Sequence, residues 1–490
     1  MTPEVPVTRS RVRLLPDPTR RMAKPYLPVD PTAARSGMTR VERLIGRLMD
    51  LSSQECQQTL RAVYDRHADQ YDDFDDVLMT GFSSVAHWVP DPAAMNTDTR
   101  RVIGAYFLHE HSLEGAALTN PSIVPSPDQT GVPDGSLNVI ISLRAVSEGH
   151  ISSIEFRSGV VDPTGDVDVA SPAPPMSGVR QTPLFNKRVF ERKLEGLGAD
   201  RELVGHALGG LGDTFTMENL EVALAALDDR MSTPSVQQIV HVVHWLASSN
   251  YKVAFPSSSD ISQRVLTPTG AAESRGMEDA RFVRFTESDG SVTYYGTYTA
   301  FDGSNILPQL IETADFETFR IATLNGQAAV NKGMALFPRR VGGNLAALGR
   351  SDGESNYLMV SDDVRFWHEA DQIQVPARPW ELIQIGNAGA PLETEAGWLV
   401  ITHGVGPMRR YVLGAILLDI DEPAHVIGHL REPLLAPDEE EAYGYVPNVV
   451  YSCGALVHQG QLVIAYGASD TFATFASVSL DTLLAALTDD

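Results

Sequence analysis

Apolar residues in the first part of the chain recur at helical spacing. In residues 41–51, VERLIGRLMDL, they follow a 3-1-3-1 rhythm that makes one stripe of a helix. Residues 53–79 continue the pattern behind a serine suited to cap a helix. The preceding residues 1–37 are rich in proline, arginine and threonine and are predicted to be an extended arm. We therefore expect residues 1–99 to form an N-terminal arm and a helical extension.

The pattern changes to short apolar runs from about residue 101. The runs VIGAYFL, LNVIISLRAV and ISSIEFRSGVV are typical of strands, and a loop rich in proline, glycine and serine follows at 162–183. Residues 100–183 are therefore predicted to be a first β region. Three segments with apolar residues at i, i+3 and i+4 come next, so residues 184–250 are predicted to be a helical insertion.

After Tyr251 the chain reads as strands that follow a loose repeat. A glycine turn precedes an apolar strand that ends in polar residues, and equivalent positions lie about 50 to 64 residues apart. The repeats occupy 289–303, 341–353, 395–406 and 458–470, with a fifth unit at 101–165. This period suits a four-stranded propeller blade. The predicted fold is mainly β: a five-bladed β-propeller with a helical extension and insertion, residues 251–490 forming the remaining blades.

Composition and charge narrow the function classes. Of the 490 residues, 38 are basic and 63 are acidic, which gives a net charge of -25. Such a surface repels phosphodiester backbones and anionic lipids, so neither nucleic acid nor a membrane is an expected partner. The two cysteines, Cys56 and Cys453, form no zinc-binding spacing, and no stretch approaches 18 apolar residues. We expect a cytoplasmic protein.

The segment Arg275–Phe282, RGMEDARF, places two carboxylates and two guanidiniums ahead of an apolar strand. On a regular strand Asp279 and Arg281 share one side, and Glu278 faces the other. One carboxylate is then able to face a pocket beside an arginine; a surface salt-bridge cluster is the alternative. His109 and His111 share a strand face but lack a third metal ligand, so no metal is expected. Nucleotide-binding glycine motifs are absent from the sequence.

Six segments resemble, in order, the motifs of glycoside hydrolase family 130, the mannoside phosphorylases and related β-mannosidases. They are GMEDARFV, TYTAFDG, NKGMALFPRRVGG, GAPLETEAGWLVITHGV, YVPNVVYSCGALV and YGASDTFATFASVSLDTLL, between residues 276 and 484. The resemblance implies a five-bladed propeller that acts with inversion on β-mannosides, and it makes Asp279 the general acid. The phosphate contacts that it implies, or that the sequence offers nearby, are Arg350, His403, Lys332 and Arg410, with Arg409 as a further cation.

The resemblance also suggests sugar-binding positions at strand ends. These are Arg144, Glu148, His150, Asn120, Arg281, Asp302, Asp352, Asn448 and Asp470. The sequence departs from the family's phosphorylases at Gln384, where a lysine is usual. The expected phosphate site therefore has one positive charge fewer. Because of this departure, an inverting β-mannosidase is the alternative function, with Glu393, Glu395, Asp470 or Glu148 as its general base. A third hypothesis is a non-catalytic propeller that binds carbohydrate.

The expected reaction is phosphorolysis of a β-linked mannoside to mannose 1-phosphate. It requires no cofactor beyond inorganic phosphate as co-substrate, and its expected partners are a mannoside or oligosaccharide and phosphate. The apolar stripes of residues 39–79 and 184–249 exceed what a propeller rim needs, so they also predict self-association into a homo-oligomer.

Overall fold

A computed structural model describes residues 5–28, 39–71, 73–181, 183–230 and 233–487. The chain divides into two compact units. One holds Glu114–Asp490 together with the N-terminal segment that ends at Asp17, and the other is Pro18–Leu113. None of the described helices is long and apolar enough to cross a membrane.

The unit Pro18–Leu113 is largely helical. Capping boxes at Thr39 and Ser52 start its first two helices, in agreement with the predicted helical rhythm. Its elements are β2 (Arg21–Pro25), α2 (Arg40–Met49), α3 (Ser53–His67), α4 (Phe74–Ser83), α5 (Thr97–Tyr106) and β3 (Leu108–Ser112). Val41, Leu78, Val102 and Phe107 lie in its own hydrophobic core.

Two sequence predictions differ from the structure in this region. The run VIGAYFL was predicted to be a strand, but residues 102–106 end α5, because their apolar side chains face the helical core rather than a sheet. The boundary predicted after residue 99 therefore falls inside a helix. The predicted arm is also divided: residues 1–4 and 29–37 lie outside the described residues, and β1 (Thr8–Leu14) belongs to the larger unit.

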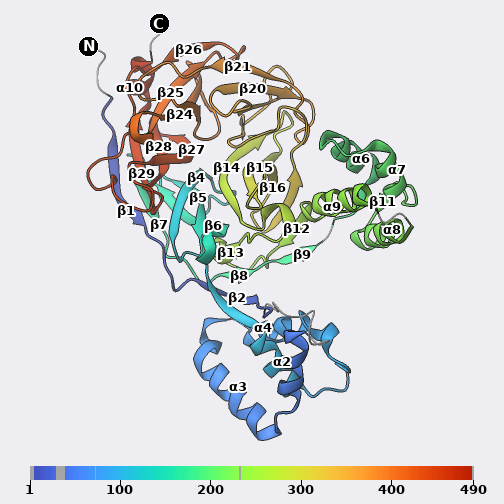
Figure 1. Ribbon diagram of the computed structural model, residues 1–490. Helices are drawn as coiled ribbons and strands as arrows, with labels where there is room; N and C mark the ends of the chain where they lie inside the picture. The colour runs from blue at the N-terminus through green and yellow to red at the C-terminus, as the bar shows by residue number, and fades with distance from the viewer. Residues whose placement is uncertain (1–4, 29–38, 72, 182, 231–232, 488–490) are drawn as a thin grey trace. The chain divides into compact units, whose positions relative to one another are not determined.

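The larger unit consists of antiparallel sheets with short connections. Its first and last strands meet in one sheet, where β1 pairs with β29 (Figure 1). This sheet has the order β1, β29 (Phe472–Ser479), β28 (Gln461–Ala468) and β27 (Val450–His458). The next strands along the chain are β4 (Ala117–Pro125), β5 (Leu137–Val146), β6 (Ser152–Val161) and β7 (Val167–Val169), each paired with its predecessor.

The third group of strands joins β6 through one parallel pair, Gly276 with Ser152. It comprises β14 (Gly276–Thr286), β15 (Val292–Phe301), β16 (Ile306–Thr313), β17 (Thr318–Thr323), β12 (Tyr251–Ala254) and β9 (Val179–Gln181). The fourth is β18 (Ala335–Leu336), β19 (Leu345–Gly349), β20 (Asn356–Ser361) and β21 (Ala370–Gln374). The fifth is β22 (Gln384–Asn387), β23 (Leu392–Thr394), β24 (Gly397–Val405), β25 (Tyr411–Leu418) and β26 (Val426–His429). The mainly β class is confirmed, and the closed ring of five blades stays a prediction.

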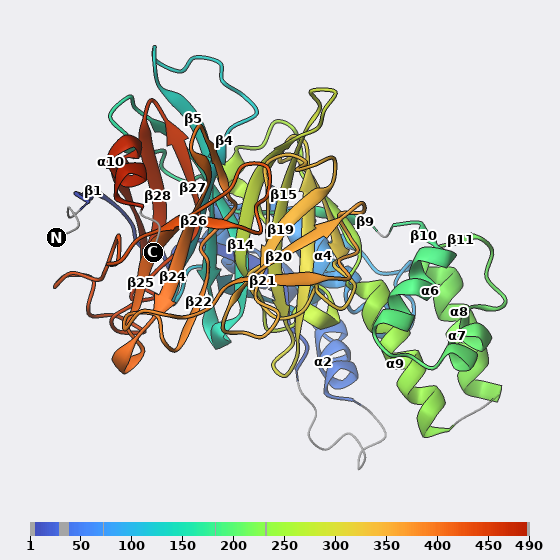
Figure 2. The same cartoon turned by 90° about the horizontal axis from the view of Figure 1, so that it is seen from above.

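Four helices form the predicted insertion, and they lie together beside β9 and β12 in both views (Figures 1 and 2). They are α6 (Lys187–Gly196), α7 (Arg201–Leu208), α8 (Met217–Arg230) and α9 (Pro234–Ser248). Two short strands, β10 (Phe185–Asn186) and β11 (Thr214–Phe215), pair within the insertion. Phe190, Leu208 and Val243 are buried in its own core, so the apolar stripes have a partner within the chain.

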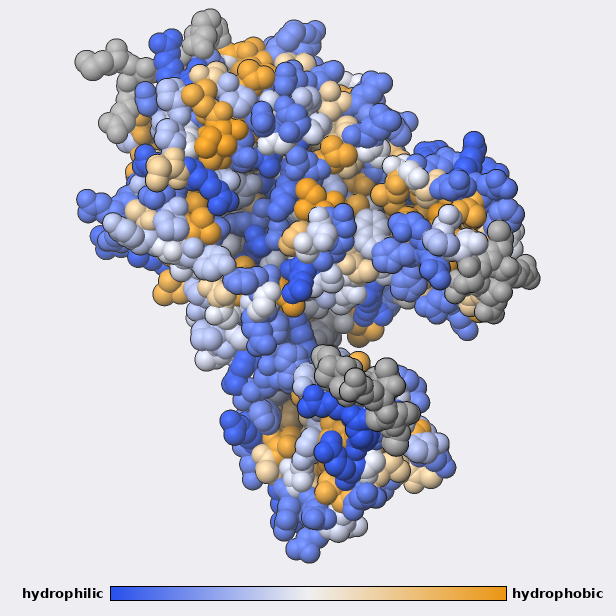
Figure 3. Space-filling model, viewed as in Figure 1, coloured by the Kyte–Doolittle hydropathy of each residue, from blue (hydrophilic) through white to orange (hydrophobic). Residues whose placement is uncertain are grey.

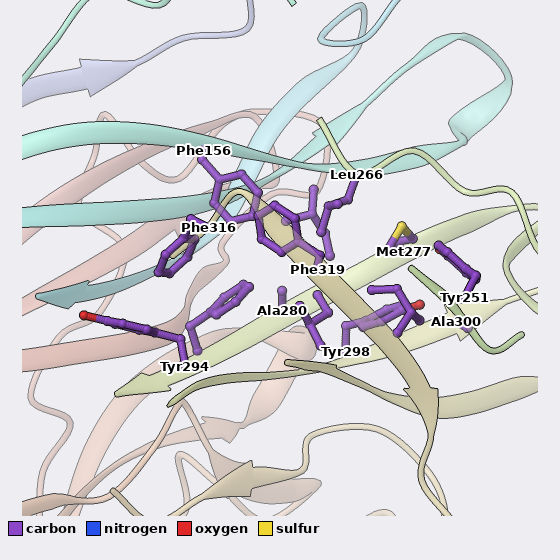
Figure 4. Packing of buried hydrophobic residues seen from close by; sticks show 14 of the residues in the cluster. Phe156, Tyr251, Leu266, Met277, Ala280, Tyr294, Tyr298, Ala300, Phe316 and Phe319 are labelled. Atoms are coloured by element: carbon purple, nitrogen blue, oxygen red, sulfur yellow. The ribbon is translucent and has the colours of Figure 1, made fainter. Parts of the chain in front are cut away.

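Aromatic packing holds β6 against strands of the third group, with which it shares a sheet. Phe156 of β6 lies 5.8 Å from Phe282 of β14, measured between ring centroids. The Phe156 ring also lies 5.5 Å from that of Phe319 in β17, and both of these residues are labelled in Figure 4. Tyr251 and Tyr298 both donate hydrogen bonds to the buried carboxylate of Glu273. Hydrophilic residues cover much of the visible face, with apolar residues in separate patches (Figure 3). The core thus holds β14, the strand that carries the predicted acid, from both sides.

Candidate active site

The predicted acid lies at a β-bulge of β14. The pairing of β14 with β15 shifts between Glu278 and Arg281, and Asp279 has a φ of 56°, in the left-handed region. A bulge breaks the alternation of side chains along a strand. The prediction that Glu278 faces away from Asp279 is therefore wrong: both carboxylates meet the same guanidinium, that of Arg144 in β5.

A compact charge cluster surrounds these two carboxylates. Arg144 Nη2 lies 2.6 Å from Glu278 Oε1, and its Nη1 lies 3.4 Å from Asp279 Oδ1. Lys332 Nζ donates to the other oxygen of Glu278 at 2.8 Å. The side-chain amide of Asn120, which also has a positive φ, donates to Asp279. Glu278 is thus occupied by two cations, whereas Asp279 shares only the longer contact with Arg144.

A second chain of contacts runs from Asp279 to His403. Arg281 donates to the backbone carbonyl of Asp279 at 3.0 Å and to the hydroxyl of Tyr451 at 2.6 Å. The Tyr451 ring lies 5.0 Å from the imidazole of His403. His403 Nδ1 lies 3.2 Å from the carbonyl oxygen of Asn387, and its Nε2 lies 3.3 Å from Arg350 Nη1. The residues belong to β14, β27, β24 and β22, with Arg350 directly after β19.

These contacts define the protonation of His403. A carbonyl oxygen only accepts, so Nδ1 carries the proton and Nε2 accepts from the arginine. Burial lowers the pKa of His403 well below its usual value, and the nearby charges of Arg350 and Arg281 lower it further. The imidazole is therefore neutral: it orients Arg350 and adds no positive charge of its own.

Two guanidiniums converge on one point of the site. Arg350 Nε and Arg281 Nη2 lie 3.6 Å and 3.8 Å from the position that a Cβ on Gly333 would take. The Nε atoms of both arginines are buried without a hydrogen-bond partner among the described residues. Buried donors normally have partners, so the two unpaired Nε atoms, together with the two guanidiniums that approach Gly333, indicate a place for an anion.

The charges around Asp279 keep it ionised. Burial by itself raises the pKa of this carboxyl, but three nearby cations outweigh burial and leave the pKa below its usual value. These cations are Arg144, Arg281 and Lys332. The effect on Asp470 is opposite: burial raises its pKa, and the neighbouring Asp279 carboxylate raises it further. Asp470 and the preceding Ser469 both have positive φ.

The sequence profile described as beta-1,4-mannooligosaccharide phosphorylase, that of glycoside hydrolase family 130, matches residues 237–489. This span contains the bulge at Asp279 and the Arg350–His403 pair. The chain belongs to glycoside hydrolase family 130. The family match begins within α9, so the unit Pro18–Leu113 and most of the helical insertion lie before it.

Curated relatives of this family member are phosphorylases. The 1,2-beta-oligomannan phosphorylase of Thermoanaerobacter sp. is 33% identical over 219 residues, which are 43% of this chain and 71% of that protein. The beta-1,2-mannobiose phosphorylase of Listeria innocua is 30% identical over 42% of this chain, and the chain spans 58% of that protein's length. The solved complex of the Listeria innocua enzyme with beta-1,2-mannobiose aligns with a TM-score of 0.45 at 21% identity, over 77% of this chain and 93% of that one.

Eight of the predicted site residues of this family member meet in the cluster. They are Asp279, Arg144, Arg281, Asn120, Lys332, Arg350, His403 and Asp470. Gln384, the residue predicted to replace a lysine, is the first residue of β22 and lies two residues before Gly386. The motif positions therefore converge even though they lie far apart in the sequence.

The structure places the other predicted residues in different roles. Asp302 and Asp352 accept backbone hydrogen bonds in their own turns, and Arg410 donates to the carbonyl of Pro437. The contacts of Asp302 and Asp352 are local, whereas Arg410 reaches a carbonyl 27 residues along the chain. Asn448 is exposed with a positive φ, and its carbonyl accepts from the amide of Tyr411, so its role is in the turn.

Three of the four candidate general bases also lie outside the cluster's described contacts. Glu393 is paired with Arg339 at 2.6 Å, and Glu395 and Glu148 are exposed. His150, next to Glu148, is exposed and contacts Tyr445. Asp470 is the candidate whose carboxyl interacts with Asp279.

Sequence reasoning missed two side chains of the site. Tyr451 links Arg281 to His403, and burial raises the pKa of its hydroxyl to about 12, so it acts as a neutral donor and acceptor. Asn387 donates to the carbonyl of Gly333 at 2.6 Å while its own carbonyl holds His403. Tyr451 lies inside a family motif and Asn387 lies just before one. Only their three-dimensional contacts distinguish these two residues from their neighbours in the sequence.

Proposed function

We propose that this family member is a β-mannoside phosphorylase, in which inorganic phosphate attacks the anomeric carbon with inversion and releases mannose 1-phosphate. The observation that carries the proposal is the pair of converging guanidiniums, Arg281 and Arg350, beside Asp279. Planar guanidinium groups suit the oxygens of a phosphate dianion. The curated relatives are named as phosphorylases of differently linked β-mannosides, which supports the same reaction class here.

In this mechanism the phosphate lies between Arg281 and Arg350 at the Gly333 backbone. A phosphate oxygen forms the new bond to the anomeric carbon while the bond to the leaving oxygen breaks. The leaving oxygen takes a proton that comes from Asp279, directly or through a sugar hydroxyl. Neutral His403 holds Arg350 in place, and no cofactor other than phosphate takes part.

The ionised state of Asp279 suggests an order of events. Without phosphate, three cations keep its pKa low, and an ionised carboxylate is no acid. A bound phosphate dianion offsets the charge of Arg281 and brings negative charge close to the carboxyl, so it raises the pKa of Asp279. Phosphate thus both supplies the nucleophile and allows the acid to hold its proton.

The proposed architecture around this site is the five-bladed propeller. Five strand groups each contribute a residue: Asn120 from β4, Asp279 from β14, Arg350 after β19, His403 from β24 and Tyr451 from β27. The strands β4, β14 and β27 also pack on one another. A ring of blades around one axis is the arrangement that unites the ends of such distant strands.

Hydrolysis is the second candidate, and two observations favour it. Asp470 interacts with Asp279, and Gln384 stands where the family's phosphorylases usually have a lysine. In this alternative Asp470 activates a water as general base. Burial and Asp279 raise the pKa of Asp470, and a carboxylate with a raised pKa accepts a proton more readily.

Product analysis separates the two reactions. The purified full chain is incubated with β-1,2- and β-1,4-linked mannobiose, with and without 10 mM inorganic phosphate, and the products are separated by anion-exchange chromatography. We expect mannose 1-phosphate, formed only with phosphate. Free mannose at a rate independent of phosphate would establish hydrolysis, and no product from either linkage would contradict the proposed function. Cytoplasmic location and a homo-oligomer stay predictions, the latter tested by light scattering.

A further inference from the structure

A second cationic cavity lies between the helical insertion and the sheet that contains β17. Its volume is about 140 Å³, and α6 forms one wall while β17 and Arg365 form the other. Its polar lining comes from Asn186, Lys193, Asn250, Arg320 and Arg365. Three of these side chains are basic and none is acidic, although the whole chain has a net charge of -25.

Lys193 is the buried cation of this cavity. Its side chain belongs to α6 and its residue is 5% exposed. Its ammonium contacts Asn250 Oδ1 at 3.0 Å and the carbonyl oxygen of Thr323 at 3.5 Å, and both oxygens are neutral. Buried charges are normally paired with an opposite charge. Lys193 therefore has its polar contacts but no neutralising partner at hydrogen-bond distance among the described residues.

The two arginines add further positive charge. Arg365 uses Nε and Nη2 to pair with Glu312, at 3.1 and 2.5 Å, and its Nη1 donates in no described hydrogen bond. Arg320 is exposed and forms no ion pair among the described residues. Burial lowers the pKa of Lys193 to about 7, and the charges of Arg365 and Arg320 lower it more than Asp363 and Glu312 raise it. The cavity thus repels its own ammonium and favours an anion.

We propose that this cavity binds a phosphate group, either inorganic phosphate or the phosphate of a small monoester, at a site separate from the catalytic one. A volume of about 140 Å³ is well above the roughly 10–15 Å³ that a single water needs on this measure, so the cavity has room for a phosphate group. Lys193 offers a charged donor from one wall, and Arg320 and Arg365 offer charged donors from the other. The site shares no residue with the Arg281–Arg350 pair.

A phosphate group here would join the insertion to the sheet, because Lys193 belongs to α6 and Arg320 to β17. The site therefore offers a way for phosphate, or a phosphorylated sugar, to stabilise the helical insertion against the β unit. The inference does not depend on catalysis, and its test measures binding at Lys193 rather than turnover.

Pyridoxal 5′-phosphate is a suitable probe, because it carries a phosphate and an aldehyde. An uncharged lysine amine adds to the aldehyde, loses water and leaves an imine, which borohydride reduces to a stable amine. The chain has five lysines, at positions 24, 187, 193, 252 and 332, so peptide mass spectrometry resolves every one of them. At pH 7 a pKa near 7 leaves about half of Lys193 uncharged, against less than about 0.1% of an ordinary lysine.

We expect the probe to label Lys193 at least tenfold faster than the exposed Lys252. Inorganic phosphate at 10 mM is expected to slow the labelling of Lys193 at least fivefold, and the same concentration of glycerol 3-phosphate tests the monoester. Stronger protection by glycerol 3-phosphate would identify a monoester ligand, and stronger protection by phosphate the free ion. Labelling of Lys193 no faster than that of Lys252, or labelling unaffected by both anions, would overturn the proposal.

Two variants test whether Arg320 takes part in the proposed phosphate site. Arg320→Gln removes an exposed cation that packs in no core, so the chain is expected to fold normally while Lys193 labels at least threefold more slowly. The matched control, Lys252→Gln, alters an exposed lysine of the neighbouring strand β12 and leaves the labelling of Lys193 unchanged. Equal labelling in Arg320→Gln and the control would remove Arg320 from the site and contradict the proposal.

Discussion

At the scale of single residues, Asp279 is a carboxylate whose pKa three nearby cations lower, and in the proposed mechanism it needs bound phosphate before it acts as an acid. Its φ of 56° is unusual for a residue other than glycine, and such strain is retained where neighbouring contacts hold it. Asn120 and Arg144 hold the side chain, and Arg281 holds the backbone carbonyl. The residue is therefore fixed by three different elements.

Replacing this carboxyl should abolish turnover without unfolding the chain. Asp279→Asn keeps the shape but carries no acidic proton, so we expect kcat for mannobiose phosphorolysis to fall by at least about 100-fold, the usual range for a general acid. The melting temperature should stay within about 2 °C. The control Asp289→Asn alters an exposed turn carboxylate and should keep full activity. Activity of Asp279→Asn near that of the control would exclude this acid.

Gly386 is predicted to be essential for the position of Arg350. A Cβ at this residue would stand 2.5 Å from His403 Cε1 and 2.6 Å from Arg350 Cδ, closer than such atoms approach. Gly386→Ala should therefore displace the guanidinium and raise the KM for phosphate at least tenfold, while the KM for the mannoside changes less. Gly46→Ala, where a Cβ has open space in α2, is the control. Initial rates measured at varied phosphate concentration give this KM. An unchanged KM for phosphate would contradict the prediction.

His403 should make the folded state sensitive to mild acid. Its pKa is lowered by burial and by Arg350, so the unfolded chain binds more protons than the folded chain below about pH 6.5. This stabilisation is complete above pH 6.5 and is lost as the pH falls toward the folded pKa, by up to about 1.4 kcal/mol for each pH unit. Between pH 7.5 and 5.5, urea unfolding should show a larger loss for the wild type than for His403→Gln. Equal losses would show that His403 is not held neutral.

The sequence identified the residues of this site better than their orientation. The family resemblance predicts one cluster that contains Asp279, Arg350 and His403. The structure connects these three residues through Arg281 and Tyr451. Glu278 was placed on the wrong side, since regular alternation is all that a single strand predicts and the bulge depends on pairing with β15. Asp302 and Asp352 have the right chemistry but satisfy their own turns, which short sequence patterns do not separate from a binding site.

At the scale of elements, the periodicity predicted most helices, but it failed where an apolar run was short. Residues 102–106 fit a strand as well as a buried helix end, and the contacts of Val102 and Ile103 with the helical core decide for the helix. The pairing of β1 with β29 had no sequence signal at all, because it joins residues more than 450 positions apart. Long-range pairing of this kind requires the whole fold.

The pairing of β1 with β29 should contribute substantially to stability. Without β1, strand β29 becomes an exposed edge, and the buried Glu441 loses its contacts with Arg9. Deleting residues 1–14 should lower the melting temperature by at least about 4 °C, since about 1 kcal/mol shifts a domain of 150–250 residues by about 2–4 °C. The control Arg13→Ala removes an exposed ion pair and should shift it by less than about 1 °C. Equal melting temperatures for the two variants would show that β1 is dispensable.

At the scale of the whole molecule, the unit Pro18–Leu113 interrupts a fold that is continuous without it. The residues on either side of this unit lie together, because the amide of Asp17 donates to Glu114 Oε2 at 2.9 Å. The unit has its own core, and it contributes no residue to the described contacts of the catalytic cluster. A chain in which a short glycine–serine linker replaces residues 18–113 is therefore geometrically possible.

We predict that this linker variant folds and keeps its phosphorolysis rate within about threefold of the full chain. The sheet formed by β1 and β29 remains intact, because residues 5–17 stay in place. Calorimetry of the full chain should show two unfolding transitions, of which the variant retains one, since compact units with separate cores unfold separately. If the variant is folded by circular dichroism but has lost more than about 100-fold in rate, the helical unit takes part in catalysis. Its role then extends beyond a separately folded module, and the catalytic cluster alone is not sufficient for turnover.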